Sequence, residues 1–144
     1  MNRKGFTLIE LLVVIIILGF IGTMATVSYY NYAKTSKDKS FEMAEKTFEN
    51  DVKNAYADCL SNSNNPFCDN HQSFGYQNEI VYLKDLIKNG YSSKFKNPYN
   101  TNTYCDENLS YVKVIGSSDS GINKSATYQV CLICGDKQSS GCSN

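Results

Sequence analysis

An uncharged apolar run near the amino terminus constrains this 144-residue chain more than any other feature. Residues 11–33 hold 23 positions without one charged side chain, and across residues 6–29 Glu10 is the only charged group. A helix over residues 6–29 spans ~36 Å at ~1.5 Å per residue, which exceeds the ~30 Å hydrocarbon layer of a bilayer. The run therefore predicts a helix that stays in a membrane, because the apolar stretch of a cleaved export signal is only about 7–15 residues long.

The rest of the composition limits the size and the partners of the protein. A chain of this length can form one compact domain with an appendage, but it is too short for a large multidomain enzyme. Lys and Arg together number 14 and Asp and Glu number 14, so no net charge draws the chain to nucleic acid or to anionic lipid. The sequence leaves nucleic acid open as a partner and indicates no small-molecule substrate.

All six cysteines lie after the apolar run, in a segment with few large apolar side chains. Segments of this kind usually depend on disulfides, which form on the oxidising, extracytoplasmic side of a membrane. We therefore expect the apolar run to send the cysteine-rich part across the membrane. The disulfide candidates are Cys59, Cys68, Cys105, Cys131, Cys134 and Cys142.

The connectivity of the cysteines cannot be deduced from the sequence alone. We favour Cys59 with Cys68, which would tie a helix end to its loop, and Cys134 with Cys142, which would pin the tail. Elimination then pairs Cys105 with Cys131. The Cys131–Cys134 spacing also occurs in zinc and redox motifs, but no second such pair accompanies it, so disulfides are favoured over a metal or thiol site.

A short motif at the start of the apolar run carries a family resemblance. Residues 4–11 read Lys4-Gly5-Phe6-Thr7-Leu8-Ile9-Glu10-Leu11, and this string resembles the class III signal of type IV pilins and pseudopilins. The resemblance implies that residues 1–5 are a leader, that a membrane prepilin peptidase cuts after Gly5, and that the new amine on Phe6 is methylated. It also implies that Glu10 pairs with the amine of Phe6 in a neighbouring subunit during assembly.

Physical chemistry supports that role for Glu10. A carboxylate inside an apolar span is unfavourable without a counter-ion, and an amine attracts it strongly in a medium of low dielectric. Two alternatives stay open. Glu10 could reach the interface of a simple membrane anchor, or signal peptidase could cut after residues 23–25 and release a free domain. The three possibilities give mature chains that begin at Phe6, Met1 and Thr26.

A helical pattern continues beyond the span. Gly19 and Gly22, within the span, permit either close helix packing or local unwinding. Packing is favoured because the proline that similar pilins often carry in this stretch is missing here. We expect one helix over residues 6–60, with a membrane or filament-core half at 6–29 and an amphipathic half at 30–60. Apolar residues in steps of three and four mark one face of the second half, at Phe41, Ala44, Phe48, Val52, Ala55, Tyr56 and Cys59.

Residues 61–144 are expected to form a small disulfide-bonded head. With the long helix they predict an α+β, pilin-like fold, in which the helix packs on a small antiparallel sheet of two to four strands. The expected elements are a loop over 61–73, a short amphipathic helix over 81–90 ended by Gly90, a turn over 96–100, and strands over 109–115 and 126–133.

No constellation of residues indicates catalysis. His71 lies alone in an Asn-rich loop and is interpreted as a surface histidine rather than as part of a Cys-His pair. Asp119 is the only acid in the Ser-rich residues 117–121, so a solvated turn is favoured over a calcium site there. We predict no enzyme activity, no catalytic residue, no cofactor and no metal ligand.

The resemblance implies a structural subunit, a major or minor pilin of a type IV pilus, that polymerises through its helix. It would be a single-pass precursor in the bacterial cytoplasmic membrane first and part of a cell-surface filament afterwards. The resemblance implies four partners: other copies and related pilins, the prepilin peptidase, a membrane assembly platform, and lipid before assembly. The alternatives are a pseudopilin of a type II secretion or DNA-uptake system, and a membrane-anchored or secreted binding domain. Adhesion, twitching motility and DNA uptake are not distinguished.

Overall fold

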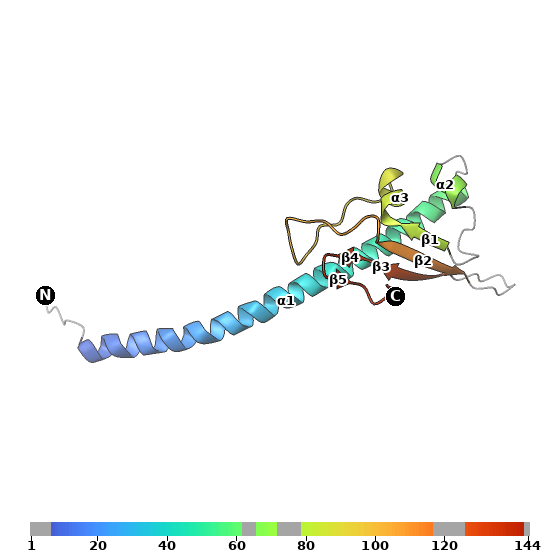
Figure 1. The fold of residues 1–144 in the computed structure, drawn as a ribbon. Helices are drawn as coiled ribbons and strands as arrows, with labels where there is room; N and C mark the ends of the chain where they lie inside the picture. The colour runs from blue at the N-terminus through green and yellow to red at the C-terminus, as the bar shows by residue number, and fades with distance from the viewer. Residues whose placement is uncertain (1–6, 62–65, 72–78, 117–125, 143–144) are drawn as a thin grey trace. The chain divides into compact units, whose positions relative to one another are not determined.

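The fold is known from a computed structural model, which describes residues 7–61, 66–71, 79–116 and 126–142 (Figure 1). The chain divides into two compact units, Met1–Asp38 and Lys39–Asn144, and each is described by itself. Helix α1 (Leu8–Ser61) supplies residues to both. The expected α+β, pilin-like combination of a long apolar amino-terminal helix, a small antiparallel sheet and disulfides is confirmed.

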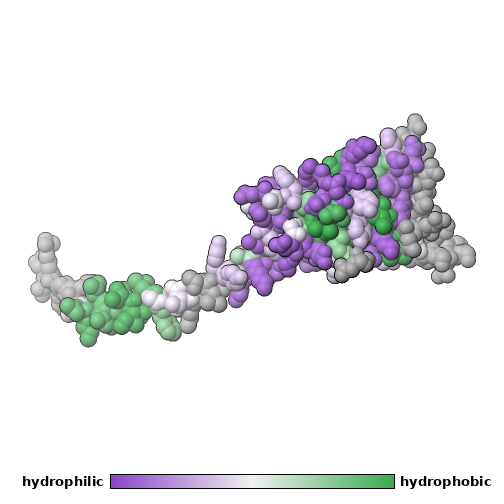
Figure 2. Space-filling model, in the orientation of Figure 1, coloured by the Kyte–Doolittle hydropathy of each residue, from purple (hydrophilic) through white to green (hydrophobic). Residues whose placement is uncertain are grey.

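The first unit contains the apolar half of α1. The helix continues through Gly19 and Gly22 without a break, so the described chain shows no unwinding at these glycines. Within the described residues, α1 is the one helix that is long and apolar enough to cross a membrane. Figure 2 shows the hydrophobic colouring concentrated along this half of the helix.

The second unit has its core against the amphipathic half of α1. The predicted stripe is confirmed, because its members are buried except for Ala44, which is partly buried. Phe48 and Val52 are fully buried. The stripe packs with the buried sheet and helix residues Val81, Leu83, Leu86, Val112 and Val114.

A three-stranded antiparallel sheet covers this stripe, in the order β1 (Glu79–Tyr82), β2 (Tyr111–Gly116) and β3 (Ala126–Cys131). Val81 lies opposite Val112, and Val114 lies opposite Tyr128, so alternate side chains of all three strands point to one face. The strand expected over 126–133 ends at Cys131. Ile133 instead begins a separate hairpin of β4 (Ile133–Cys134) and β5 (Lys137–Gln138).

The helix expected over residues 81–90 begins later than predicted. Val81 and Tyr82 belong to β1, and α3 runs over Leu83–Lys88. The reason is that Ile80, Val81 and Tyr82 are strand-favouring residues whose partner, β2, lies far along the sequence. Gly90 follows the helix with a φ of 80°, which agrees with its predicted role as the stop.

The loop expected over residues 61–73 contains a short helix, α2 (Pro66–Asn70). Proline is well suited to the first helical position, where its missing N–H has no partner in any case. Phe67 and Cys68 are buried, and the Asn70 side-chain amide donates to the Pro66 carbonyl at 3.0 Å. Tertiary burial therefore gives structure to a segment whose composition is typical of a loop.

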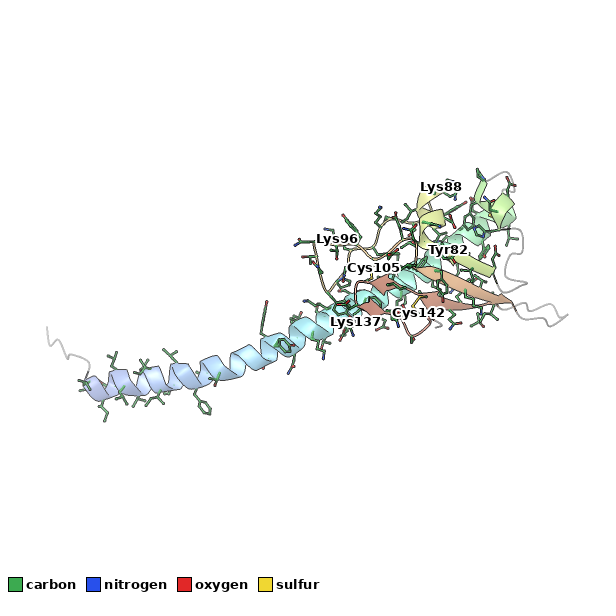
Figure 3. The ribbon with its side chains drawn as sticks, in the orientation of Figure 1. Tyr82, Lys88, Lys96, Cys105, Lys137 and Cys142 are labelled. Atoms are coloured by element: carbon green, nitrogen blue, oxygen red, sulfur yellow. A yellow bond between two sulfur atoms is a disulfide. The ribbon has the colours of Figure 1, made fainter. Side chains whose placement is uncertain are left out.

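Three disulfides lie in the second unit, and two of the three expected pairs are wrong. Cys59 is joined to Cys68, the pair that the sequence favoured. Cys105 is joined to Cys134, and Cys131 to Cys142, instead of the expected Cys134–Cys142 and Cys105–Cys131. Figure 3 labels Cys105 and Cys142, one from each of these two bridges.

Backbone contacts explain the exchange of partners. The Asp106 N–H donates to the Ile133 carbonyl at 2.7 Å, which places the preceding Cys105 beside Cys134. The tail passes the end of β3 so closely that a Cβ atom on Gly141 would lie 2.2 Å from the Val130 carbonyl oxygen. Cys142 therefore meets Cys131, the last residue of that strand.

Disulfide mapping under non-reducing conditions is expected to recover the Cys105–Cys134 and Cys131–Cys142 links. Cleavage after Leu132 with chymotrypsin and after Lys137 with trypsin, on denatured protein with free thiols blocked, separates Cys131, Cys134 and Cys142 from one another. The two connectivities then give linked peptides of different mass. A peptide that joins Cys134 to Cys142 would contradict the observed course of the tail.

Candidate processing and assembly site

The residues that sequence analysis assigned to processing and assembly lie around the start of α1. Gly5 and Phe6 fall outside the described residues. Glu10 stands in the first turn of the helix, and its side chain is exposed. It is the only acid or base between residue 7 and residue 33.

Glu10 and Thr7 form a reciprocal cap at the start of the helix. The backbone N–H and the hydroxyl of Thr7 both donate to Glu10 Oε2 at 2.9 Å, and the Glu10 N–H donates to Thr7 Oγ1 at 3.4 Å. This is the capping box, which satisfies N–H groups that the first helical turn leaves unpaired. Both bonds from Thr7 use Oε2, and no described residue donates to Oε1.

Sequence analysis missed Thr7 as a site residue. The pattern Thr7-Leu8-Ile9-Glu10 is the Thr-x-x-Glu signature of a capping box, so the signal was present.

The apolar side chains around Glu10 are exposed. Ile9, Val13 and Val14 line an open hollow of about 280 Å³ together with Glu10. Leu8 is 83% exposed, and the large side chains of the following turns are exposed as well. An apolar surface of this extent is unfavourable in water and requires lipid or other protein to cover it.

The start of α1 lies in a segment that matches a known family. Residues 1–26 match the family model described as the prokaryotic N-terminal methylation motif. The chain carries the signature of type IV pilins and pseudopilins. No curated protein and no solved structure matches the chain in the corresponding searches.

The pilin signature has general consequences for the chain. Proteins with this motif are in general structural proteins that a prepilin peptidase processes and that polymerise. Together with the apolar helix it fits a membrane-anchored precursor. The match ends at residue 26, so it does not reach the head.

The remaining candidates from the sequence have other environments. Cys131 and Cys134 are both in disulfides, so neither offers a thiolate to a metal or a substrate. Residues 117–121, including Asp119, lie outside the described residues. Among the described residues there is no group of three or more metal-ligating side chains.

The interpretation of His71 as a surface histidine is wrong. Its side chain is only 11% exposed, and its Nδ1 lies 2.7 Å from Glu79 Oε1. The His71 ring also stacks near Phe67, with 4.4 Å between centroids. The Cys59–Cys68 bridge holds α2 against the end of α1, and this brings the residue after α2 onto β1.

Tyr56 joins the same polar cluster from α1. Its hydroxyl donates to Glu79 Oε2 at 2.9 Å, so Glu79 accepts from α1 and faces His71 at the same time. Burial, and then the hydrogen bond and negative charge of Glu79, raise the pKa of Tyr56 far above its usual value near 10. The cluster thus ties the helix to the sheet only while Tyr56 keeps its proton.

The stability of the head is expected to fall as pH rises above about 10, in part because of Tyr56. Its pKa is raised in the folded state, so the unfolded state loses this proton first. The contribution of Tyr56 to the free energy of unfolding is therefore fully present below the unfolded pKa, and it is lost progressively as pH rises from there towards the folded pKa. Urea unfolding of the purified chain in detergent from pH 8 to 11 measures how steeply the free energy of unfolding falls with pH.

Tyr56→Phe is expected to make the free energy of unfolding fall less steeply with pH above about 10. Tyr104→Phe is the control for the loss of a hydroxyl group, because Tyr104 is an exposed tyrosine of the same unit. Equal slopes for wild type and Tyr56→Phe would show that Tyr56 is not protected from ionisation in the folded state.

Proposed function

We propose that this chain is a structural subunit, a major or minor pilin, of a type IV pilus filament. The observation that carries the proposal is the single acid, Glu10, at the start of an exposed apolar helix half, inside a matched methylation motif. The role is structural rather than enzymatic. Its partners are other copies and related pilins, a prepilin peptidase, a membrane assembly platform and lipid.

Processing begins with cleavage between Gly5 and Phe6 and methylation of the Phe6 amine. The leader contains Arg3 and Lys4, so its removal leaves the start of the chain without basic side chains. The apolar helix stays attached and keeps the subunit in the cytoplasmic membrane until assembly. All six cysteines are in disulfides, which supports a head on the oxidising, extracytoplasmic side.

Assembly pairs the carboxylate of Glu10 with the Phe6 amine of a neighbouring copy. Thr7 holds Glu10 Oε2 and fixes the rotamer of the side chain, which orients the carboxylate before the partner arrives. In the bundle the apolar side chains exclude water, so the attraction between carboxylate and amine strengthens as the incoming helix seats. The finished filament displays the heads at the cell surface.

A pseudopilin of a type II secretion or DNA-uptake system is the second candidate. The matched motif covers only residues 1–26, a segment that pilins and pseudopilins share. The same cleavage and helix packing would operate in that case, and the fibre would stay within the secretion or uptake machine.

The mature amino terminus tests the proposal. Mass spectrometry of the chain isolated from cells is expected to find N-methylphenylalanine from Phe6 as the first residue. A chain that begins at Met1 would be an unprocessed anchor, and one that begins at Thr26 would be a released domain. Either result would overturn the proposed function. Gly5→Leu, which blocks the expected cleavage, is the matched control.

A further inference from the structure

The turn before β2 contains the triplet Asn108-Leu109-Ser110, an Asn-x-Ser acceptor for asparagine-linked glycosylation. We propose that Asn108 carries an N-linked oligosaccharide, which an oligosaccharyltransferase attaches on the extracytoplasmic side of the membrane. This proposal depends on the extracytoplasmic head of the proposed function, but on no step of filament assembly.

The turn presents Asn108 to solvent. Asp106 Oδ1 accepts the backbone N–H of Asn108 at 2.8 Å and that of Leu109 at 3.0 Å, which fixes the turn. Asn108 is exposed, and its neighbour Leu109 is 57% exposed. A glycan on the Asn108 amide would therefore extend into solvent beside an apolar side chain that it can cover, without disturbing the core.

Ser110 has the opposite environment. It is fully buried, and its Oγ accepts the Ile133 N–H at 3.0 Å. Its carbonyl accepts the Leu83 N–H, and its N–H donates to the Asp106 carbonyl, both at 3.0 Å. A transferase that recognises the Ser110 hydroxyl cannot reach it in the folded head, because Ser110 is fully buried there. The modification must therefore precede folding.

The order of the chain makes this timing feasible. Ile133, which holds the Ser110 hydroxyl in the fold, follows it by 23 residues. The amino-terminal helix enters the membrane first, so residues 108–110 reach the outer side before Ile133 does. Until then the bond from Ile133 to the Ser110 hydroxyl cannot form, and folding afterwards buries Ser110 but leaves Asn108 exposed.

The transfer step is a substitution at a sugar carbon. The donor is an oligosaccharide joined through its anomeric carbon to a lipid pyrophosphate. The Asn108 amide nitrogen forms the new C–N bond while the C–O bond to the pyrophosphate breaks. The lipid pyrophosphate leaves with the electron pair of that bond, and one amide proton passes to a base of the transferase. No oxidant or reductant takes part.

A second triplet, Asn123-Lys124-Ser125, provides an internal control in the sequence, although it lies outside the described residues. The two triplets differ in the residue that stands two positions before the asparagine. It is Asp106 for Asn108 and Gly121 for Asn123. Trypsin separates the two, because cleavage after Lys96, Lys113 and Lys124 places Asn108 in peptide 97–113 and Asn123 in peptide 114–124.

The test is mass spectrometry of tryptic peptides from the full chain, isolated from the cells that make it and then reduced, because Cys105 of peptide 97–113 is bonded to Cys134. Peptide 97–113 is expected to carry an oligosaccharide mass, with fragments that place it on Asn108. The mass is expected to be lost in Asn108→Gln and in Ser110→Ala and retained in Asn123→Gln. Ser110→Thr is expected to retain it even if the variant folds poorly, because the transfer precedes folding.

Several outcomes would overturn the proposal. An unmodified peptide 97–113 in the wild-type chain would do so, as would a glycan confined to peptide 114–124 or one that survives Asn108→Gln. Cys131→Ser, which removes a disulfide that closes the head, is expected to leave Asn108 occupancy equal or higher, and a clear fall would contradict transfer before folding. Filaments without glycan would leave the proposed function intact.

Discussion

Replacing Glu10 with glutamine is expected to lower the amount of this subunit in filaments on the order of tenfold or more. Glutamine has nearly the same shape, and its side-chain oxygen can still accept the bonds from Thr7 that cap the helix. Only the negative charge is lost, so the amine of Phe6 in the neighbouring copy would be buried without a partner. Quantitative immunoblotting of sheared filaments, relative to the membrane fraction, measures the effect.

Thr7→Val is the matched control for the same site. It removes the hydroxyl that bonds Glu10 but keeps the charge and the shape of the side chain. The filament fraction is expected to stay close to wild type, because the backbone N–H of residue 7 still donates to Glu10 Oε2 and the negative charge of Glu10 is kept. Equal filament fractions for Glu10→Gln and wild type would contradict the assembly role of the carboxylate.

Replacing Phe48 with alanine is expected to destabilise the head by about 3–5 kcal/mol, because it leaves a large cavity in the core. Phe48 is fully buried in the stripe of α1 and lies 6.0 Å, centroid to centroid, from Phe95. Neither the helix nor the loop that carries Phe95 can close this space without moving. Urea unfolding of the purified chain in detergent measures the loss.

Met43→Ala on the same helix is the control for that substitution. Met43 is 62% exposed, so its truncation is expected to change the free energy of unfolding by no more than about 0.5 kcal/mol. Similar small losses for both variants would mean that the stripe containing Phe48 does not form the core of the head.

The helix and its two kinds of surface could be predicted from the sequence because their signals are local. A long run of apolar residues without charge predicts the apolar half of the helix. In the second half, apolar residues spaced three and four apart predict one buried face, from Phe41 to Cys59. The match to the methylation motif rests on the same local string. Neither inference needs to know what lies far away in the chain.

The errors concern contacts between distant segments. The helix predicted over residues 81–90 wrongly includes Val81 and Tyr82 of β1, because the partner strand β2 starts 29 residues after β1 ends. Two predicted disulfides are wrong because the contacts that bring Cys105 to Cys134 and Cys142 to Cys131 form only in the folded head. The prediction of a surface position for His71 is wrong because its partner, Glu79, belongs to the same strand, β1.

Electron cryo-microscopy of filaments purified from cells tests the central claim most directly, namely that this chain polymerises through its apolar helix. The account predicts that this subunit is a repeating component, with residues 8–23 bundled inside the filament and the Glu10 carboxylate within ion-pair distance of the Phe6 amine of a neighbouring copy. A filament whose subunits meet only through their heads, or a chain found only as single copies in the membrane, would contradict it.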